Sequence, residues 1–151
     1  MEIQDLSPET FKKKLSPMTN ILGIDYGVKR IGIAISDMGW MIATPLKIIS
    51  GMEELDKIMR ERTVGGFIIG LPRQMNGQEG TQAELTRKWA QKIEKRYELP
   101  LLFWDERLSS KAVFRVFVEQ MDLSRNRQKT LMDKTAAAFI LQGALDYLSR
   151  L

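Results

Sequence analysis

Residues 20–37 form the stretch NILGIDYGVKRIGIAISD, which decides the predicted fold. The apolar run from Ile21 to Ile24 indicates a strand that ends at Asp25, and a short glycine-containing turn follows. From Ile31 onward, isoleucine alternates with glycine, alanine and serine, which is the period-two pattern of a second strand. One face of this strand carries only small side chains and leaves space above it. An acid at the end of a buried strand beside such a space is a candidate metal ligand.

Asp25 equally fits a turn-capping role, because aspartate often accepts backbone hydrogen bonds at the end of a strand. The pattern Gly-Ile-Asp-x-Gly also resembles the phosphate-binding hairpin that opens the actin and sugar-kinase ATPases. Those ATPases need two such domains that close on the nucleotide, whereas 151 residues provide for one. The stretch therefore favours a ribonuclease-H-like hairpin without being unique to it.

The absence of two residue types limits the possible chemistry. The chain has no Cys and no His, which excludes disulfides, thiolate nucleophiles, Ser-His-Asp triads and nearly every zinc site. An enzyme of this composition would depend on carboxylates, lysines, hydroxyls and a bound ion. Ligand sets made only of oxygen suit Mg²⁺ or Mn²⁺.

The charge and hydropathy of the chain bear on its partners and location. Lys and Arg number 23 against 19 Asp and Glu, and the net charge of +4 is compatible with a polyanionic partner or with an ordinary soluble protein. No apolar run approaches the roughly 20 residues that cross a bilayer. Residues 1–18 lack the continuous apolar core of a secretory signal. We therefore expect a cytoplasmic protein with no membrane partner.

The rest of the chain predicts helices alternating with strands. In order, we expect a strand at Met41–Ile49, a helix at Glu53–Arg62, a strand at Gly65–Leu71, a helix at Thr81–Tyr97, a strand at Leu101–Trp104, a helix from Ser109 to about Met121, and a helix from about Thr130 to Leu148. Pro45 places the third strand at an edge or a bulge. Thr81 and Glu84 match a capping box. Residues 122–129 are expected to form a basic, polar loop.

This order predicts a mixed α/β sheet with helices on both faces. Its first three strands form an antiparallel meander, and the later strands alternate with helices. Residues 1–19 are expected to be an N-terminal extension in which Ser7 caps a short helix that holds Phe11 and Leu15. Residues 20–151 are expected to form a single domain.

Four acids lie at the ends of predicted core elements. Asp25 follows the first strand, and Asp105 and Glu106 follow the last one. Alternation sends Asp105 and Glu106 to opposite faces, so only one of them can join a site on a given face. Asp133 is expected in the first turn of the final helix, on the stripe that packs against the sheet. A buried carboxylate there needs a partner, which a divalent cation shared with Asp25 would provide.

These acids could also have purely local structural roles instead of binding a metal. Thr130-x-x-Asp133 matches a helix N-terminal capping pattern, and acids are favoured there by the helix dipole. The Asp105-Glu106 pair also fits a solvated turn at the end of a strand. If these acids converge, they could hold two Mg²⁺ ions about 4 Å apart. Such a pair of ions would suit hydrolysis of a phosphodiester, because it activates the attacking water and stabilises the leaving oxygen.

Three arginines lie next to the predicted strand ends and are candidates for binding backbone phosphates: Arg30, Arg73 and Arg107. Each of them also fits an ordinary solvated arginine.

Four motifs in this order resemble the YqgF/RuvX family: GIDYGVKRIGIAISD, GFIIGLPRQMNGQEG, FWDERLSS and MDKTAAAFILQGALDYL. The resemblance covers about residues 20–148. It implies a ribonuclease-H-like fold and a metal-dependent nuclease, similar in layout to the RuvC Holliday-junction resolvases. Two roles are attached to the family, namely processing of the 5′ end of pre-16S ribosomal RNA and resolution of Holliday junctions.

The resemblance places catalytic, metal-binding acids at Asp25, Glu106 and Asp133, and it selects Glu106 over Asp105. It implies that Asp25 bridges two Mg²⁺ or Mn²⁺ ions, with Glu106 and Asp133 completing one each. The chain departs from the family in the segment before residue 20. It also departs just before Asp133, where basic residues are scattered instead of densely clustered.

We expect the nuclease to act on structured RNA, above all a ribosomal RNA precursor, as a monomer or homodimer. One alternative is a resolvase of branched DNA, which would be a dimer because two symmetric cuts need two sites. Another is a nucleic-acid-binding protein that keeps the fold without cleaving anything.

Overall fold

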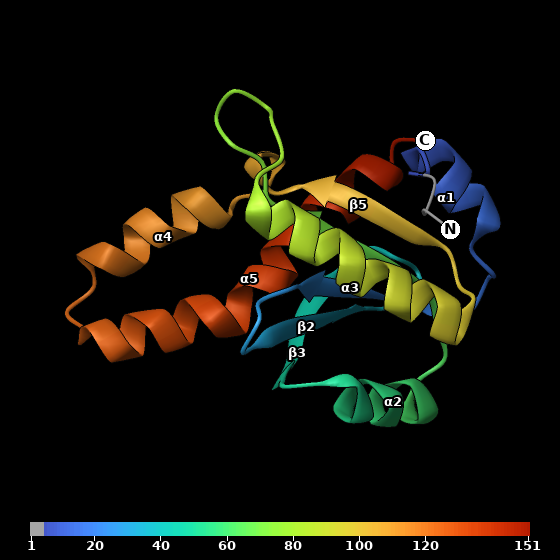
Figure 1. Ribbon diagram of the computed structural model, residues 1–151, viewed down its shortest axis with the longest axis horizontal. Coiled ribbons are helices and arrows are strands. Elements are labelled where there is room, and N and C mark those ends of the chain that lie inside the picture. The colour runs from blue at the N-terminus through green and yellow to red at the C-terminus, as the bar shows by residue number, and fades with distance from the viewer. Residues whose placement is uncertain (1–4) are drawn as a thin grey trace.

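A computed structural model of the protein describes residues 5–151 and shows a five-stranded sheet in the order β3-β2-β1-β4-β5 (Figure 1). The central strand β1 (Asn20–Asp25) is antiparallel to β2 (Ile31–Ser36) and parallel to β4 (Val64–Leu71). At the edges, β3 (Ala43–Ile49) is antiparallel to β2, and β5 (Leu101–Asp105) is parallel to β4. This confirms the predicted mixed sheet with its antiparallel meander.

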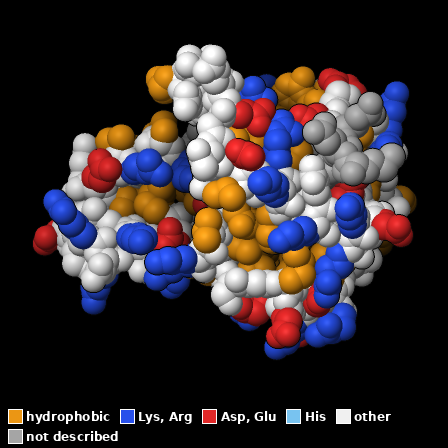
Figure 2. Space-filling model, in the orientation of Figure 1, with side chains coloured by type: hydrophobic (Ala, Val, Ile, Leu, Met, Phe, Trp, Pro, Cys, Tyr) orange, Lys and Arg blue, Asp and Glu red, His pale blue; other side chains and the backbone are white. Residues whose placement is uncertain are grey.

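Helices cover both faces of the sheet, as predicted. The helices α2 (Met52–Glu61) and α3 (Thr81–Tyr97) pack on one face. The other face is covered by α1 (Pro8–Lys14) and α5 (Arg125–Leu148). The helix α4 (Lys111–Gln120) runs beside the first half of α5, and together they project from the sheet with a hollow between them (Figures 1 and 2). Within residues 5–151, none of the helices combines the length and apolarity needed to cross a membrane.

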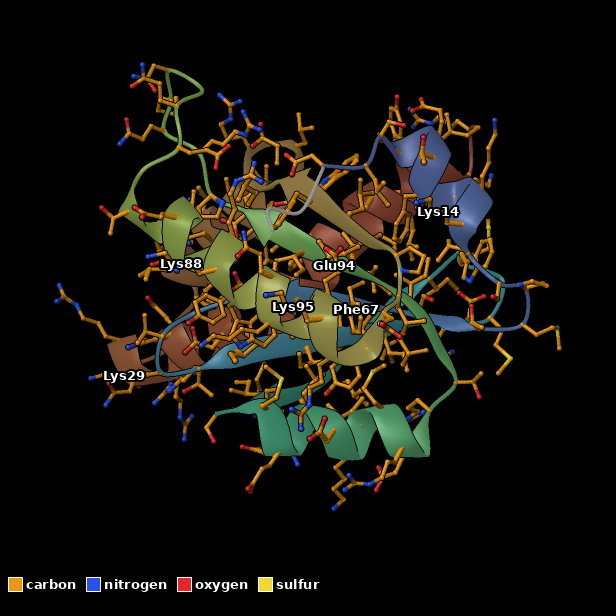
Figure 3. The ribbon with its side chains drawn as sticks, turned by 45° about the vertical axis from the view of Figure 1, so that its right-hand side comes forward. Lys14, Lys29, Phe67, Lys88, Glu94 and Lys95 are labelled. Atoms are coloured by element: carbon orange, nitrogen blue, oxygen red, sulfur yellow. The ribbon has the colours of Figure 1, made fainter. Side chains whose placement is uncertain are left out.

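The face under α2 and α3 holds the larger apolar cluster. Phe67 of β4 is fully buried there, and its ring lies 5.8 Å from that of Tyr97 on α3 (Figure 3). Leu55 and Ile58 of α2 are buried in the same cluster. Gly65–Leu71, predicted as a strand, is buried throughout.

The first helix joins the core on the opposite face. Ser7 caps α1 as predicted, and its Oγ accepts a hydrogen bond from the Thr10 backbone N–H at 3.2 Å. Phe11 is fully buried, and Leu15 packs in the same cluster. Lys12 Nζ donates to the carbonyl oxygen of Leu148 at 2.8 Å. Residues 5–19 therefore share the hydrophobic core of the sheet.

The start of α5 corrects two predictions. Residues 122–129, predicted as a loop, include the first turn of this helix, because Ser124 is its N-cap and accepts from the Arg127 N–H at 3.2 Å. Thr130 is no capping residue, since its Oγ1 donates to the Asn126 carbonyl within the helix. Asp133 consequently lies about two turns inside α5 and not in its first turn.

The N-terminal cap of α3 and the start of β3 also differ from the sequence prediction. The predicted capping box is wrong, because Gly80 is the N-cap of α3 and no side chain caps that end. The third strand begins at Ala43 and not Met41, because Asp37 Oδ1 accepts from the N–H groups of Met41 and Ile42, at 2.8 Å each, and holds them in a turn. Pro45 does lie on an edge strand beside a register shift, so both positions predicted for it are confirmed.

The helix α5 fills the space above the small residues of β1 and β2. A Cβ placed on Gly23 would lie 2.6 Å from the Cβ of Leu141 and 3.1 Å from the Ala137 carbonyl oxygen. Ala34 of β2 is fully buried in the cluster under the same helix. The face of small side chains predicted from the sequence is therefore the surface on which α5 packs.

Replacing Gly23 by alanine should destabilise the protein by about 1–3 kcal/mol, because the added methyl group overpacks the contact with α5. Gly51→Ala is the matched control, since a Cβ at Gly51 meets nothing within 4 Å, and it should cost less than about 1 kcal/mol. Equilibrium unfolding in urea measures both. Equal midpoints for Gly23→Ala and the wild type would contradict the packing described.

A carboxylate bridge between α2 and α3 should make stability depend on pH. Hydrogen bonds from Arg96 and Tyr97 lower the pKa of Asp56 from 3.8 to about 2. A lowered folded-state pKa stabilises the protein above pH 3.8, and this contribution is lost as the pH falls towards 2. Asp56→Asn should therefore lower Tm at pH 7, and the difference from wild type should shrink between pH 4 and 2. A difference that stays constant over this range would rule out the charge as its cause.

Candidate active site

Asp25 and Glu106 lie together at one edge of the sheet. Because β1, β4 and β5 are parallel, their carboxyl ends share that edge. The two carboxylates face a single ammonium group, since Lys111 Nζ lies 3.8 Å from Asp25 Oδ2 and 3.8 Å from Glu106 Oε2. The three side chains are only 18–24% exposed. The structure thus brings together two of the three acids singled out in the sequence.

A sharp turn after β5 directs Glu106 toward Asp25. The segment Glu106–Leu108 is a short 3₁₀ helix, and its N-cap is Asp105, which accepts a hydrogen bond from the Arg107 N–H at 2.9 Å. Glu106 then lies over Gly70 of β4, where a Cβ would be 2.8 Å from Glu106 Oε1. Only glycine at position 70 leaves room for this carboxylate. Asp105 makes its contacts elsewhere, with Arg107.

The electrostatics of the pair are unfavourable without a cation. Burial raises the pKa of Glu106, and the negative charge of Asp25 raises it further, while the Lys111 ammonium acts in the opposite direction. The negative charge of Asp25 therefore disfavours the ionised form of Glu106. The pair is therefore a site at which positive charge is stabilised.

Asp133 lies at the same edge but outside this group. Its Oδ2 accepts a hydrogen bond from Arg30 Nη1 at 3.1 Å, and the two side chains are 30% and 59% exposed. Gly32, which pairs with Asp25 in the sheet, separates the two acids: a Cβ there would lie 3.2 Å from the Asp133 carbonyl oxygen and 3.7 Å from Asp25 Cβ. In the part of the chain that the structure describes, no three acids converge closely enough to hold a metal ion together.

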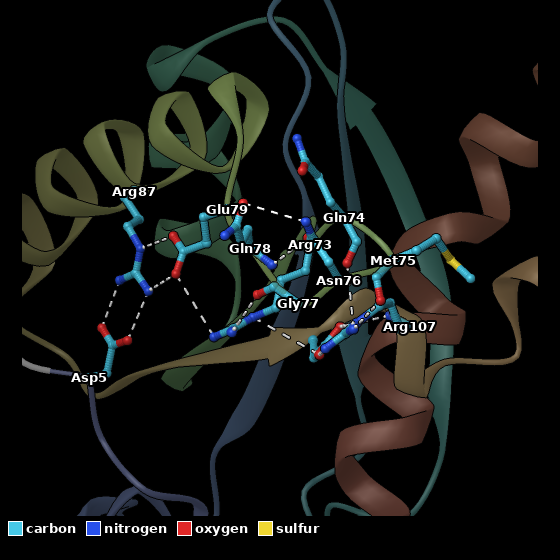
Figure 4. Close-up of polar contacts among 11 residues, drawn as sticks. Asp5, Arg73, Gln74, Met75, Asn76, Gly77, Gln78, Glu79, Arg87 and Arg107 are labelled. Carbon is cyan, nitrogen blue, oxygen red and sulfur yellow. Dashed lines mark hydrogen bonds and ion pairs between the residues drawn. The ribbon is translucent and has the colours of Figure 1, made fainter.

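Arg107 is engaged with Asp105 and with the loop that follows β4 (Figure 4). Its Nη2 lies 2.7 Å from Asp105 Oδ2 and its Nε 3.1 Å from both oxygens. Its Nη1 lies 3.5 Å from the carbonyl oxygens of Gln74 and Met75. The guanidinium group lowers the pKa of Asp105 through these hydrogen bonds. In this conformation Arg107 anchors the loop of residues 72–80.

Arg73 supports the same loop from within. Its Nη1 donates to the Gly77 carbonyl oxygen at 3.3 Å, and its guanidinium lies 3.9 Å from Glu79 and 4.0 Å from Asp105. Glu79 is held in turn by Arg87 at 2.6 Å (Figure 4). Arg73, Arg107 and Arg30 are thus all paired with carboxylates, and Arg30 is the most exposed of the three.

A cationic hollow adjoins Asp133. The cavity between α4 and α5 has a volume of about 680 Å³. Val118 and Met132 line it together with three cations, Arg115, Arg125 and Lys129, which outnumber the two acids of the lining, Glu119 and Asp133. Hydrophobic side chains are visible within it and Lys and Arg side chains around it (Figure 2). Arg125 and Lys129 are two of the basic residues that appeared scattered before Asp133 in the sequence, and Arg115 of α4 joins them here.

Two residues of the site, Lys111 and Gly70, were not predicted from the sequence. Lys111 is the first residue of α4 and contacts acids that lie far from it in the sequence, so no local pattern marks it. Gly70 ends the apolar run of β4, and its position directly before the loop was the one available signal.

Comparison with known proteins identifies relatives over nearly the whole chain. A family model, RuvX, described as Holliday junction resolvase, matches residues 19–147. A protein of Rhodobacter capsulatus named "Putative pre-16S rRNA nuclease" is 45% identical over 149 residues, which cover 95% of this chain and 93% of that protein. A protein of Phenylobacterium zucineum with the same name is 44% identical, over 89% of this chain and 91% of its own.

Among solved structures, that of Thermus thermophilus RuvC in complex with a Holliday junction substrate is similar to this chain. The two are 13% identical with a TM-score of 0.49, over 85% of this chain and 94% of that one. The family match and the sequence relatives together establish that the chain belongs to the RuvX family.

Proposed function

We propose that this protein is a nuclease that hydrolyses phosphodiester bonds with the help of Mg²⁺ or Mn²⁺, and that its substrate is the precursor of 16S ribosomal RNA. The observation that carries the proposal is the convergence of Asp25 and Glu106 on one cationic position at the edge of the sheet. The names of the relatives provide the substrate class.

The donor groups fit a hard divalent ion. Both side chains offer carboxylate oxygens, and the chain contains no His or Cys that would favour a softer metal. The pair already accommodates one positive charge, that of Lys111. When bound, the ion would stabilise the charge that develops on the phosphate and make a water molecule more acidic.

Asp133 and Arg30 would act on the opposite side of the site from Glu106. We assign Asp133 as the third acid of the site, carried toward Asp25 by α5. It must first exchange its contact with Arg30, and an ion pair this exposed contributes at most about 1 kcal/mol. A substrate phosphate is a suitable new partner for Arg30, because guanidinium groups bind phosphate oxygens with paired hydrogen bonds. Substrate binding would thereby free Asp133.

The hollow between α4 and α5 would hold the nucleic acid beside the scissile bond. Arg115, Arg125 and Lys129 line it, and Asp133 lies in its wall. Contacts from cations to phosphates position a nucleic acid without reading its bases. This assignment explains why the basic residues occupy the hairpin that projects from the sheet.

A second candidate substrate is branched DNA, favoured by the description of the matching family model. The same acids would perform the same hydrolysis. Two symmetric cuts across a junction would then need two copies of the chain. RNA processing needs only one.

Replacing Asp25 by asparagine should abolish cleavage and leave the fold intact, because the amide keeps the shape of the side chain but loses its charge. The rate should fall at least 100-fold, since removing a ligand exceeds the roughly 10- to 100-fold loss typical of outer-shell partners. The measurement is incubation of both proteins with Mg²⁺ or Mn²⁺ and either precursor rRNA or a four-way DNA junction.

Asp146→Asn is the matched control, since this exposed acid near the end of α5 lies outside the site. The Asp146→Asn variant should cleave the substrate as fast as the wild type. Equal cleavage by Asp25→Asn would refute the mechanism. Cutting of the junction alone would favour the second candidate. Binding that persists in EDTA, without cleavage of either substrate, would identify a non-catalytic binder.

A further inference from the structure

We propose that Lys111 is a built-in competitor for the metal ion. Its ammonium group offsets one of the two negative charges of the Asp25–Glu106 pair, and it must leave before a divalent cation binds between them. The inference rests on the proposed function, because it requires the metal to bind this pair.

The contacts of Lys111 are those of an exchangeable counterion. Its Nζ lies 3.8 Å from each carboxylate, which is longer than the roughly 2.7–2.9 Å of a charge-assisted hydrogen bond. Two arginine pairs of the neighbouring network are much closer, at 2.7 Å between Arg107 and Asp105 and 2.6 Å between Arg87 and Glu79. The ammonium group is therefore held mainly by charge and not by directed hydrogen bonds.

The charges of the three groups show why a divalent ion would displace it. Two ionised carboxylates carry two negative charges, and the ammonium group offsets only one of them. A divalent cation offsets both and coordinates the oxygens directly. Lys111 has a flexible four-carbon stem, so its charge can turn toward solvent without any movement of α4.

The position of Lys111 in its helix supports the same role. It is the first residue of α4, whose first turn contains no acid. A cation is unfavourable at this end of a helix, because the N-terminus carries the positive end of the helix dipole. The charge of Lys111 therefore does not stabilise the helix, whereas it does stabilise the pair of carboxylates.

All three acids of the proposed site have a basic neighbour. In the described residues, Lys111 forms ion pairs with Asp25 and Glu106, while Arg30 forms an ion pair with Asp133. Each acid thus has a basic counterion within 4 Å. The Lys111 contacts are the more buried, since the Arg30 side chain is 59% exposed and that of Lys111 is 18% exposed. Displacement of Lys111 is consequently the step that would limit metal affinity.

The test is the affinity of the full chain for Mn²⁺, without substrate, measured by calorimetry and by the electron paramagnetic resonance of free Mn²⁺. Lys111→Met keeps the length of the side chain and removes its charge. It should bind Mn²⁺ about tenfold more tightly than the wild type, because a unit charge about 4 Å away no longer competes. Its metal-free Tm should fall, and the rise in Tm on adding Mn²⁺ should be larger than in the wild type.

Lys29→Met is the matched control. Lys29 is exposed in the turn between β1 and β2 and extends away from the sheet (Figure 3), so its removal changes the net charge equally without touching the pair. Its Mn²⁺ affinity should stay within about twofold of the wild type. Lys111→Gln provides the same measurement if the methionine variant does not fold.

Unchanged or weaker Mn²⁺ binding by the Lys111 variants would overturn the inference, because a purely structural or assisting lysine predicts that result. Asp25→Asn separates this failure from failure of the proposed function. If the wild type binds Mn²⁺ and Asp25→Asn does not, the metal site stands whatever Lys111 does. If Asp25→Asn binds as tightly as the wild type, the metal site itself is wrong and both proposals fall.

Discussion

Two carboxylates at one edge of a sheet repel each other, and this protein holds them together around a cation. Asp25 and Glu106 are fixed there by the parallel arrangement of β1 and β5 on either side of β4. Burial raises the pKa of Glu106, and Lys111 offsets part of the cost. Sites of this kind reduce stability in exchange for chemistry, because the charge that relieves them comes from a ligand.

The second constraint is the close approach of α5 to the sheet. Glycines at positions 23 and 32 let the helix backbone lie almost on β1 and β2, so Asp133 reaches the edge that carries Asp25. The same helix buries Ala137, Ile140 and Leu141 in the core. One helix therefore stabilises the fold and carries an acid of the proposed site, and its first half forms a cationic hollow with α4.

The sheet could be predicted because its signals are local. Alternation in residues 31–36, the continuous apolar run of β4 and the order of the elements were enough to give the meander and the mixed sheet. The start of α5 could not be predicted as well, because its first two turns are polar and basic and show no apolar face. At the true start of the helix, Ser124 before Arg125 was the only capping signal. It was weaker than the Thr130-x-x-Asp133 pattern further along the chain.

The nearness of Asp25 and Glu106 could be predicted from the sequence, but their counterion could not. Strand ends mark Asp25 and the Asp105-Glu106 pair, whereas the contact of Lys111 with Asp25 and Glu106 arises only when the fold brings the first residue of α4 to the edge of the sheet that carries both acids. The partnership of Arg73 and Arg107 with Asp105 likewise depends on the conformation of the loop after β4. Sequence patterns reveal which groups can carry charge, and the fold decides which charges meet.

The central claim is that this carboxylate pair binds a divalent cation. Anomalous diffraction from crystals grown with Mn²⁺ tests it most directly. The account predicts a manganese peak bonded to oxygens of Asp25 and Glu106, with the Lys111 side chain turned away. Density that keeps Lys111 between the two carboxylates, with manganese bound elsewhere or absent, would contradict it.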